Sequence, residues 1–387
     1  MTLSSDSTVL VSAGEVSGDH YIARLCTILR SLRYGGRICG LCGQESAASG
    51  AEALWRNERL HLLGIAEVIG SIADILKLLG EMKRFVLNEA PRALIFVDSP
   101  DFHLPLIRRL RRGGYGGKIF YVSPPSVWAW RSYRARDLSM YVDECLPLFK
   151  FEHEYLKKTG VTSFWTGHPL VGEFAGLKID VKAAAARITK GASDIDRDRV
   201  VALLPGSRMA EIEQLYPVLA AVAEKLDSRG FTPVFSLAPG LSERARGFLL
   251  GKLRDSGQHY YDGPGRELMA LSKAVAGSSG TATAEALLLK RYMVVIYKMK
   301  PLSAFIGKLL LSHLFFALPN LLAGEMFFPE LIQERATPEA VAGELFTWLG
   351  TDRAGRAAKE SRMGELARSM GTPDAYDFWA RRILEAL

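Results

Sequence analysis

Residues 200–208, VVALLPGSR, carry the strongest fold signal in this sequence. The apolar run Val200–Leu204 has the length and composition of a buried strand. A proline and a glycine end it, Ser207 suits a helix N-cap, and apolar residues recur at helical spacing from Ile212. The backbone N–H groups of that first helical turn, the helix dipole and the Arg208 guanidinium would bind an anion such as phosphate. The alternative is an ordinary strand–turn–helix with a surface arginine.

A second turn of this kind occurs later in the chain. A strand-like run through Ala276 leads into the small residues 277–283, and a helix through Leu289 follows. Small residues let the backbone approach a ligand, so this turn would bind a second phosphate, while Glu285 would accept hydrogen bonds from a ribose. Neither turn has the Gly-Lys-Ser/Thr of a Walker loop, which favours a nucleotide sugar over phosphoryl transfer.

Two amide side chains complete the candidate nucleotide-sugar site, because Asn and Gln can read a uracil edge or a sugar hydroxyl. All candidates lie in the second half of the chain. They are Gly206, Ser207, Arg208, Ser279, Gly280, Thr281, Ala282, Glu285, Asn320 and Gln333.

The first half presents carboxylates where its strands are expected to end. Thr8–Ala13 and Ala93–Val97 have the composition of buried strands, and open α/β sheets bind ligands at the carboxyl ends of their strands. Asp98 follows the second strand and is our candidate general base. Asp101 competes for that role, although it is also placed to cap the following helix. The turn after the first strand adds two candidate carboxylates, Glu15 and Asp19.

An aromatic loop and an apolar segment suggest a phosphorylated substrate with acyl chains. The strand Lys118–Val122 leads into a proline-stiffened loop whose tryptophans and arginine suit a sugar or acyl surface and a phosphate contact, or else simple domain packing. The segment Leu62–Val86 has more apolar surface than one buried stripe needs, so it would lie on a bilayer or receive acyl chains, or be a two-sided core helix. Residues 302–318 are similarly apolar, which suits an interface or the core. The acceptor and lipid candidates are Trp128, Trp130, Arg131, Ile65, Val68, Ile69 and Ile72.

Composition narrows the class of protein. The chain has 387 residues, a net charge of +7 and a pI near 9.1, which predict two domains and an anionic partner. It has no basic tract interleaved with aromatics, so nucleic acid is not expected. Cys39 and Cys42 have the spacing of a redox or metal pair, but nothing completes a metal site, so we expect buried structural cysteines and no metal. The start of the chain has no secretory signal pattern, which favours the cytoplasm.

Successive strand–helix units in both halves predict an α/β protein with two Rossmann-like domains facing a cleft. We expect an acceptor-side domain over residues 1–170, with its membrane-contact segment at 62–86. A nucleotide-sugar domain over 171–349 follows, and then a helical tail over 350–387. Trp348 and Trp379 need partners elsewhere, so the tail would pack on the first domain or on a partner subunit.

The sequence resembles the lipid-A-disaccharide synthase family of inverting glycosyltransferases nearly from end to end. The resemblance implies a fold of the GT-B type with the nucleotide sugar held by the second domain. Lys150, Glu173 and a second proline at Pro125 depart from the family pattern. The matching motifs are Ala13–Glu15 with Ser17–Asp19, Asp98 with Pro100–Phe102, Val127–Arg131, Gly167–Leu170, Leu203–Arg208, Ser279–Thr281 with Glu285, and Leu318–Asn320 with Gln333.

The resemblance also implies a reaction. UDP-2,3-diacylglucosamine would donate its sugar to 2,3-diacylglucosamine 1-phosphate, giving a β-1,6-linked disaccharide and UDP at the inner face of the cytoplasmic membrane. No cofactor is implied, and a homodimer is an option. Two alternatives stay open: another UDP-sugar enzyme, such as a peptidoglycan glycosyltransferase or a UDP-N-acetylglucosamine 2-epimerase, or a non-catalytic membrane-associated protein that binds a nucleotide sugar. The apolar segment favours a lipid substrate, and the candidate carboxylates favour an enzyme.

Overall fold

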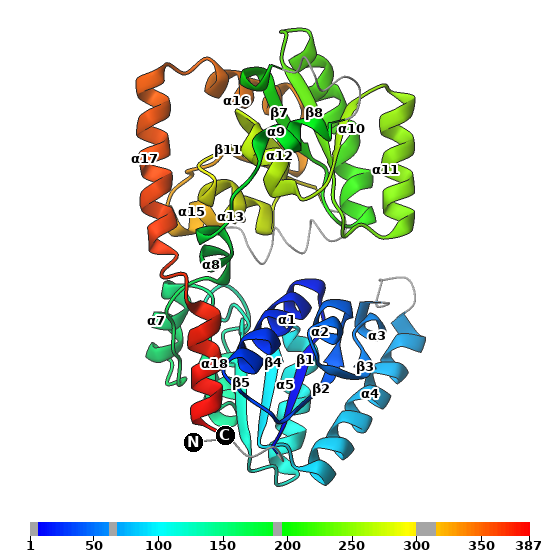
Figure 1. Ribbon diagram of the computed structural model, residues 1–387, viewed down its shortest axis with the longest axis vertical. Coiled ribbons are helices and arrows are strands. Elements are labelled where there is room, and N and C mark those ends of the chain that lie inside the picture. The colour runs from blue at the N-terminus through cyan, green and yellow to red at the C-terminus, as the bar shows by residue number, and fades with distance from the viewer. Residues whose placement is uncertain (1–6, 62–67, 189–195, 299–314) are drawn as a thin grey trace. The chain divides into compact units, whose positions relative to one another are not determined.

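The computed structural model describes residues 7–61, 68–188, 196–298 and 315–387, with the side chains of 61–72 and of 197 left undescribed. The chain divides into two units (Figure 1). Unit 1 contains Met1–Gly172 and Met370–Leu387, and unit 2 contains Glu173–Ser369. The expected boundary after residue 170 lies two residues before the observed one. The expected tail is divided, because its first helix belongs to unit 2 and its last to unit 1.

Unit 1 is built on a six-stranded parallel sheet in the order β3-β2-β1-β4-β5-β6. Its strands are β1 (Thr8–Ala13), β2 (Arg37–Cys42), β3 (Glu52–Arg56), β4 (Ala93–Val97), β5 (Lys118–Val122) and β6 (Glu144–Leu146). Its helices are α1 (Val16–Ser31), α2 (Gln44–Ala48), α3 (Glu58–His61), α4 (Val68–Glu89), α5 (Pro100–Arg112), α6 (Arg134–Tyr141), α7 (Lys150–Lys158) and α18 (Ala375–Glu385), while α8 (Pro169–Ala175) spans the boundary.

Both faces of this sheet are buried, as is usual for parallel sheets, and alternate strand residues point to opposite faces. In β1, Val9 and Val11 pack with α1 and α18, whereas Leu10 packs with α4 and α5. The same alternation explains why Cys39 and Cys42 do not face each other. Cys39 and Cys42, three positions apart in β2, point to opposite faces, and burial raises their thiol pKa values to about 11 and about 12. All four cysteines are buried and unpaired, which confirms the structural interpretation.

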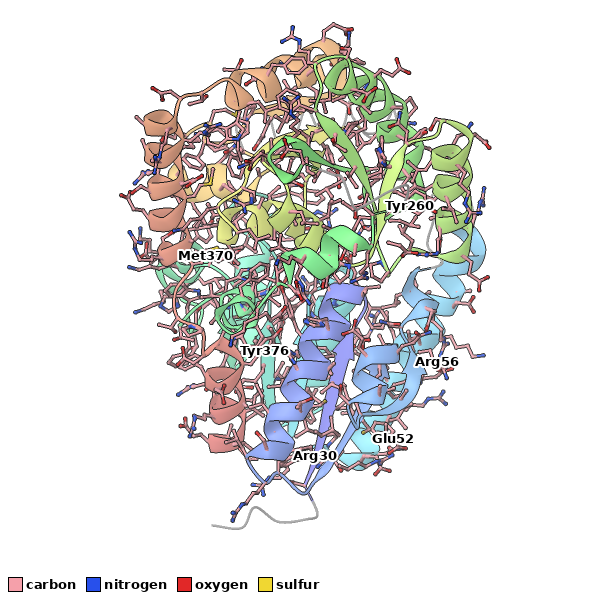
Figure 2. The ribbon with its side chains drawn as sticks, turned by 45° about the horizontal axis from the view of Figure 1, so that its top comes forward. Arg30, Glu52, Arg56, Tyr260, Met370 and Tyr376 are labelled. Carbon is pink, nitrogen blue, oxygen red and sulfur yellow. The ribbon has the colours of Figure 1, made fainter. Side chains whose placement is uncertain are left out.

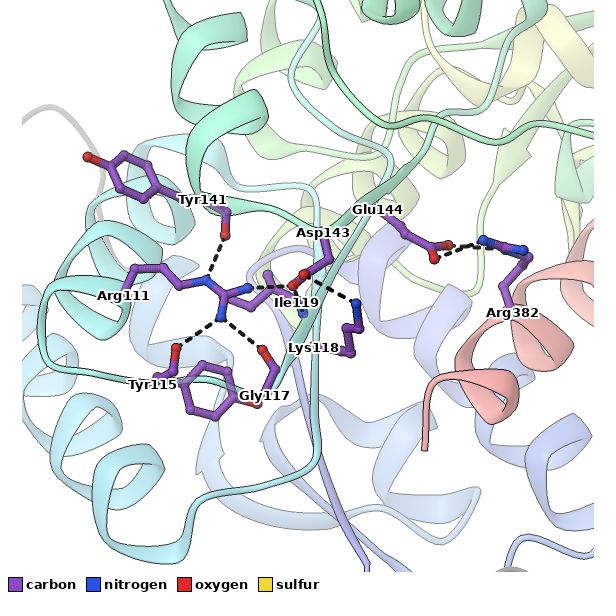
Figure 3. A network of polar contacts seen from close by, with 9 residues as sticks. All are labelled: Arg111, Tyr115, Gly117, Lys118, Ile119, Tyr141, Asp143, Glu144 and Arg382. Atoms are coloured by element: carbon purple, nitrogen blue, oxygen red, sulfur yellow. Dashed lines mark hydrogen bonds and ion pairs between the residues drawn. The ribbon is translucent and has the colours of Figure 1, made fainter.

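The C-terminal segment returns to unit 1 and closes one face of its sheet. Figure 2 marks Met370, where this segment begins, and Tyr376 on α18. Trp379 is fully buried and meets the ring of Tyr21 on α1 edge-on, with centroids 6.0 Å apart. Arg382 forms a two-pronged ion pair with Glu144 of β6, at 2.8 and 3.1 Å (Figure 3). Trp379 therefore has its packing partners within the same chain.

A partly buried network of hydrogen bonds holds the loops that precede β5 and β6. The Arg111 guanidinium donates to the carbonyl oxygens of Tyr115, Gly117 and Tyr141, at 2.9 to 3.1 Å, and pairs with Asp143 (Figure 3). Because this network lies at the amino edge of the sheet, it leaves the carboxyl edge to other residues.

Unit 2 repeats the architecture with a second parallel sheet in the order β12-β11-β10-β7-β8-β9. Its strands are β7 (Val200–Leu204), β8 (Thr232–Leu237), β9 (His259–Asp262), β10 (Ala274–Ser278), β11 (Tyr292–Tyr297) and β12 (Glu330–Ile332). Its helices are α9 (Val181–Ala186), α10 (Met209–Asp227), α11 (Glu243–Asp255), α12 (Gly265–Leu271), α13 (Thr281–Leu288), α15 (Leu318–Ala323), α16 (Pro338–Leu349) and α17 (Arg353–Ser369). Short 3₁₀ turns occupy Arg197–Arg199 and Gln333–Arg335.

Trp348 of α16 also finds its partners within the chain. Its indole N–H donates to the Lys273 carbonyl at 3.0 Å, and its ring stacks on Tyr292 with centroids 4.6 Å apart. Of the two apolar segments, Ile65 and residues 302–314 lie outside the described residues, and the side chains of Val68, Ile69 and Ile72 are not described. Within the described residues, no helix is both long and apolar enough to cross a bilayer.

Candidate functional site

The carboxyl edge of the unit 1 sheet brings two candidate carboxylates onto neighbouring strands. Ala13 of β1 pairs with Val97 of β4, so Glu15 and Asp98 follow paired positions. The two turns pack tightly, because a Cβ on Gly14 would lie 2.3 Å from the Ser99 hydroxyl oxygen. The strand order reverses direction between β1 and β4, which is where open α/β sheets bind ligands.

Asp98 stands in an unusual backbone conformation at this edge. Its φ is +54°, and the φ of Ser99 is +46°. A non-glycine residue in this left-handed region costs on the order of 1–3 kcal/mol, and such strain is typical of functional sites. Asp98 is partly exposed as a residue. Glu15 is exposed at the N-cap of α1.

Asp19 has a structural role, which corrects its assignment to the catalytic group. The helix α1 begins at Val16, so Asp19 lies in the first turn and is buried. Its carboxylate accepts hydrogen bonds from the backbone N–H groups of Gly43 and Glu45, at 2.7 and 3.0 Å, and from the Ser46 hydroxyl. Both oxygens therefore hold the amino terminus of α2 in place, and neither is left to take a proton from a substrate.

Asp101 lies in the first turn of α5, but its side chain contacts the aromatic loop instead of capping the helix. It makes no capping bond to α5 and instead forms ion pairs with Arg131, at 2.6 Å, and with Arg134. The Arg131 guanidinium also lies 4.0 Å from the centre of the Trp130 ring, which is 45% exposed. Two cations thus fix the Asp101 carboxylate, which leaves Asp98 as the better candidate for a base.

Glu152 holds the other tryptophan of this loop and is a residue that the sequence analysis missed. The Trp128 indole N–H donates to the Glu152 carboxylate at 3.1 Å, and the Ser126 hydroxyl also bonds to it. The carboxyl group is buried, and this desolvation raises its pKa to about 7. A carboxylate directly after the aromatic pair Phe149 and Phe151 was the available signal. Trp128 is therefore anchored, whereas Trp130 faces solvent.

In the first glycine turn of unit 2, the backbone N–H groups bond to the carboxylate of Glu211. Gly206 has a φ of +108°, and the chain enters α10 with Arg208 rather than Ser207 as N-cap. The Glu211 carboxylate accepts from the backbone N–H groups of Ser207 and Arg208, at 3.0 and 3.4 Å. The N–H groups of Ser207 and Arg208 are therefore engaged, and binding of phosphate at this turn stays a prediction. The Arg208 side chain remains 72% exposed.

The second glycine turn presents an open helix terminus. Its N-cap is Gly280, with φ +151°, which brings no side chain to cap α13. Apart from Gly280 itself and its neighbours along the chain, no described atom lies within 4 Å of the position that a Cβ on Gly280 would take. Thr281 is exposed and Ala282 is partly exposed, so the first N–H groups of α13 are near solvent. The positive end of this helix is therefore suited to a phosphate.

Ser279 and Glu285 frame this terminus. The Ser279 hydroxyl donates to the Phe316 carbonyl at 3.0 Å, which ties the turn to the segment before α15. Glu285 lies one turn into α13, and burial raises the pKa of its carboxyl group to about 7, with Glu173 adding to the rise and Arg266 opposing it. Near neutral pH this side chain can act as either a donor or an acceptor toward a ligand hydroxyl.

Asn320 has a structural role, which corrects its assignment to base or sugar recognition. Its amide is fully buried, donates to the Phe328 carbonyl and to the Glu330 carboxylate, each at 2.8 Å, and accepts from the Phe328 N–H at 2.6 Å. Glu330 also accepts from the N–H groups of Phe316 and Ala317. This cluster supports the segment that Ser279 contacts. Asn320 thus acts on the open turn only through the backbone.

Gln333 stands at the same edge of the unit 2 sheet. It follows β12 directly, is partly exposed and has a φ of +52°. Unit 2 therefore gathers Arg208, the turn 279–282 and Glu285 at the ends of the neighbouring strands β7 and β10, with Gln333 further along the edge. In the described part of the chain, no group of three or more His, Cys, Asp or Glu residues is placed to hold a metal ion.

Solved structures share this architecture. UDP-GlcNAc 2-epimerase from Neisseria meningitidis, bound to UDP-GlcNAc, matches with a TM-score of 0.61 at 11% identity, covering 98% of this chain and 100% of that one. Anabaena HepE in complex with UDP and glucose matches with a TM-score of 0.55 at 10% identity, with the same coverage. At such identities the likeness shows the fold alone, which is the two-domain α/β fold of the GT-B type.

Sequence relatives are far closer. The sequence profile described as Lipid-A-disaccharide synthetase matches residues 9–372. The lipid-A-disaccharide synthase of Azotobacter vinelandii is 39% identical over 345 residues, which cover 88% of this chain and 89% of the relative. That of Anaeromyxobacter dehalogenans is 37% identical over 373 residues, covering 95% and 94%. Since these matches extend across both units, the chain belongs to the lipid-A-disaccharide synthase family.

Proposed function

We propose how this glycosyltransferase of lipid A biosynthesis carries out its reaction. It transfers the sugar of UDP-2,3-diacylglucosamine to the 6-hydroxyl of 2,3-diacylglucosamine 1-phosphate in one inverting displacement. The products are the β-1,6 disaccharide 1-phosphate and UDP. The observation that carries the proposal is the open amino terminus of α13, with Gly280 at its start and Glu285 one turn inside, in a chain of this family.

The donor's diphosphate binds at the open turn of unit 2. The N–H groups of Thr281 and Ala282 and the positive end of α13 face the phosphates, and Glu285 accepts hydrogen bonds from the ribose. The exposed Arg208 guanidinium adds a charge-assisted contact. As the glycosidic bond breaks, negative charge collects on the leaving UDP, and these groups stabilise it.

The acceptor is activated by unit 1. Asp98 takes the proton of the acceptor 6-hydroxyl as that oxygen attacks the anomeric carbon, and the electron pair of the broken C–O bond leaves with UDP. A single displacement needs no covalent intermediate, so one carboxylate suffices. Trp130 and Arg131 contact the sugar or acyl chains and the acceptor phosphate, which the exposed ring and its stacked guanidinium support.

The lipid substrates place the reaction at an anionic membrane surface. The net charge of +7 favours such a surface, and the exposed Trp130 beside Arg131 is typical of residues at a lipid interface. Sedimentation with vesicles tests this: we expect binding to vesicles that contain anionic lipid and much weaker binding to neutral ones, with a loss on raising the salt concentration.

The reaction is tested directly with both acylated sugars. Incubation of the purified chain with donor and acceptor in mixed micelles should produce equal amounts of disaccharide 1-phosphate and UDP, measured by mass spectrometry. The reaction should continue with EDTA present, because protein groups stabilise the leaving UDP. Release of UDP without disaccharide, or epimerisation of UDP-N-acetylglucosamine in its place, would contradict the proposal.

A further inference from the structure

A chain of buried polar groups ends on the backbone of Asp98. The Asp98 carbonyl oxygen receives two hydrogen bonds from the core, one from the Tyr121 hydroxyl at 2.8 Å and one from Nδ1 of His103 at 2.7 Å. The other ring nitrogen of His103, Nε2, lies 2.8 Å from the Ser12 hydroxyl. Ser12, His103 and Tyr121 are all fully buried, and they come from β1, α5 and β5.

The hydrogen-bond partners assign the tautomer of His103. A carbonyl oxygen only accepts, so Nδ1 carries the proton and donates to Asp98. In a neutral imidazole Nε2 then accepts, and the Ser12 hydroxyl is the donor. Burial lowers the pKa of His103 to about 4, so the ring stays neutral and keeps this tautomer near neutral pH.

These hydrogen bonds stabilise the strained backbone of the turn after β4. Asp98 and Ser99 both have left-handed backbone conformations, which non-glycine residues adopt at a cost. Two buried donors on the Asp98 carbonyl fix the plane of the following peptide group, and this plane sets the direction in which the Asp98 side chain leaves the backbone. Ser12 belongs to the strand that leads into Glu15, and it pairs in register with Phe96 of β4. The hydrogen bonds from Ser12 through His103 therefore connect the turn at Asp98 to the strand before Glu15.

We propose that His103, together with Ser12 and Tyr121, is a positioning residue that holds the Asp98 carboxylate in the orientation needed to remove the acceptor proton. The proposal rests on the role of Asp98 proposed above. His103 itself moves no proton and touches no substrate. Loss of its hydrogen bond lets the turn relax, and a displacement of about 1 Å at a catalytic group lowers turnover by about 100-fold.

The chain offers a matched control for Tyr121. The Tyr115 hydroxyl, also buried, donates to the Pro91 carbonyl at 2.7 Å, at the amino end of the same sheet. Tyr115→Phe and Tyr121→Phe each remove one buried hydroxyl bond to a backbone carbonyl. Both should lower the melting temperature by a similar amount. Only Tyr121→Phe should lower kcat, by about tenfold, with the KM for both sugars and the affinity for UDP unchanged.

His103 is tested by removal and by rescue. His103→Leu removes both ring contacts and should lower kcat by about 100-fold. In His103→Asn the side-chain NH₂ takes the place of Nδ1–H, so the bond to Asp98 returns and most of the turnover with it. Equal kcat values for Tyr121→Phe and Tyr115→Phe, with Asp98→Asn inactive, would overturn this inference alone. Normal turnover of Asp98→Asn would instead overturn the proposed role of Asp98.

Discussion

The two sheets have the same strand order but different chemistry at their carboxyl edges. Counted from its own first strand, each unit follows the order 3-2-1-4-5-6, and the direction of winding reverses between β1 and β4 in unit 1 and between β7 and β10 in unit 2. In unit 1 these strands are followed by Glu15 and Asp98. In unit 2 they are followed by Arg208 and the open terminus of α13.

The difference separates the effect of strand topology on where a ligand binds from the effect of the local sequence on which ligand binds. The strand order determines where a ligand can reach the edge of a sheet, and the residues after the first and fourth strands determine the charge found there. Unit 2 makes its turns with Gly206 and Gly280, which tolerate positive φ values. Unit 1 uses Asp98 and Ser99 instead, so its turn is strained and depends on buried hydrogen bonds. A carboxylate needs an accurately placed side chain, whereas a phosphate site needs only exposed amides.

The largest expected effect is on turnover, and it tests whether unit 1 supplies the base while unit 2 binds UDP. Asp98→Asn should lower kcat by about 1,000-fold, within the range for loss of a general base, while the dissociation constant of UDP changes by less than about twofold. Arg208→Ala should do the reverse and weaken UDP binding by about tenfold, because one charge-assisted contact is lost. Single-turnover kinetics and calorimetric titration with UDP measure the two quantities.

Glu15→Gln is the control for this pair, because it also removes a carboxylate from the edge of unit 1. It should leave a larger share of the turnover than Asp98→Asn does. If Asp98→Asn weakened UDP binding as much as Arg208→Ala did, the division of roles between the units would be wrong.

A smaller effect tests the ribose contact of unit 2 through pH. Burial raises the pKa of Glu285 to about 7, so the side chain is mostly protonated at pH 6 and mostly ionised at pH 8. Ribose hydroxyls donate best to the ionised carboxylate, so UDP binding should tighten by up to about tenfold over this range. Glu285→Gln should lose this dependence. The second ionisation of the UDP phosphate occurs in both proteins, so it cancels in the comparison of their calorimetric affinities.

Much of the fold could be predicted because the signals are local. The strands β1, β4, β5 and β7 agree residue for residue with their predicted ranges, since each is an apolar run bounded by turn-forming residues. The glycine turns, and the carboxylate that follows β4, could also be placed from the sequence, because parallel strands bring their carboxyl ends to one edge.

The partners of polar side chains could not be predicted, because they come from distant parts of the fold. Asp19 was predicted as a catalytic carboxylate and Asn320 as a ligand-binding amide, but the N–H groups at the start of α2 and the backbone of Phe328 bond to them. Glu152 was missed in the sequence, yet it anchors Trp128. For an isolated polar residue, the sequence shows what it can donate or accept but not which group it meets.

The smallest expected effect concerns Glu211, the carboxylate that occupies the first glycine turn of unit 2. Glu211→Gln keeps an oxygen that accepts from the Ser207 and Arg208 N–H groups, so the turn should hold its shape while one negative charge disappears. If the UDP diphosphate lies near both turns, the lost repulsion is worth about 0.5–1 kcal/mol at the distances and dielectric of a protein surface, and UDP should bind two- to fivefold more tightly.

Glu213→Gln removes the same charge from an exposed position on α10, and so corrects for the change in net charge. An affinity gain in Glu211→Gln beyond that of Glu213→Gln would place the diphosphate within reach of both turns. Equal affinities in the two variants would place the phosphates at the α13 terminus alone. Arg208 would then contact UDP through its long side chain, while the backbone of its own turn would not. The two glycine turns would have separate roles, because the turn at Gly206 would only shape the backbone and the turn at Gly280 would bind the ligand.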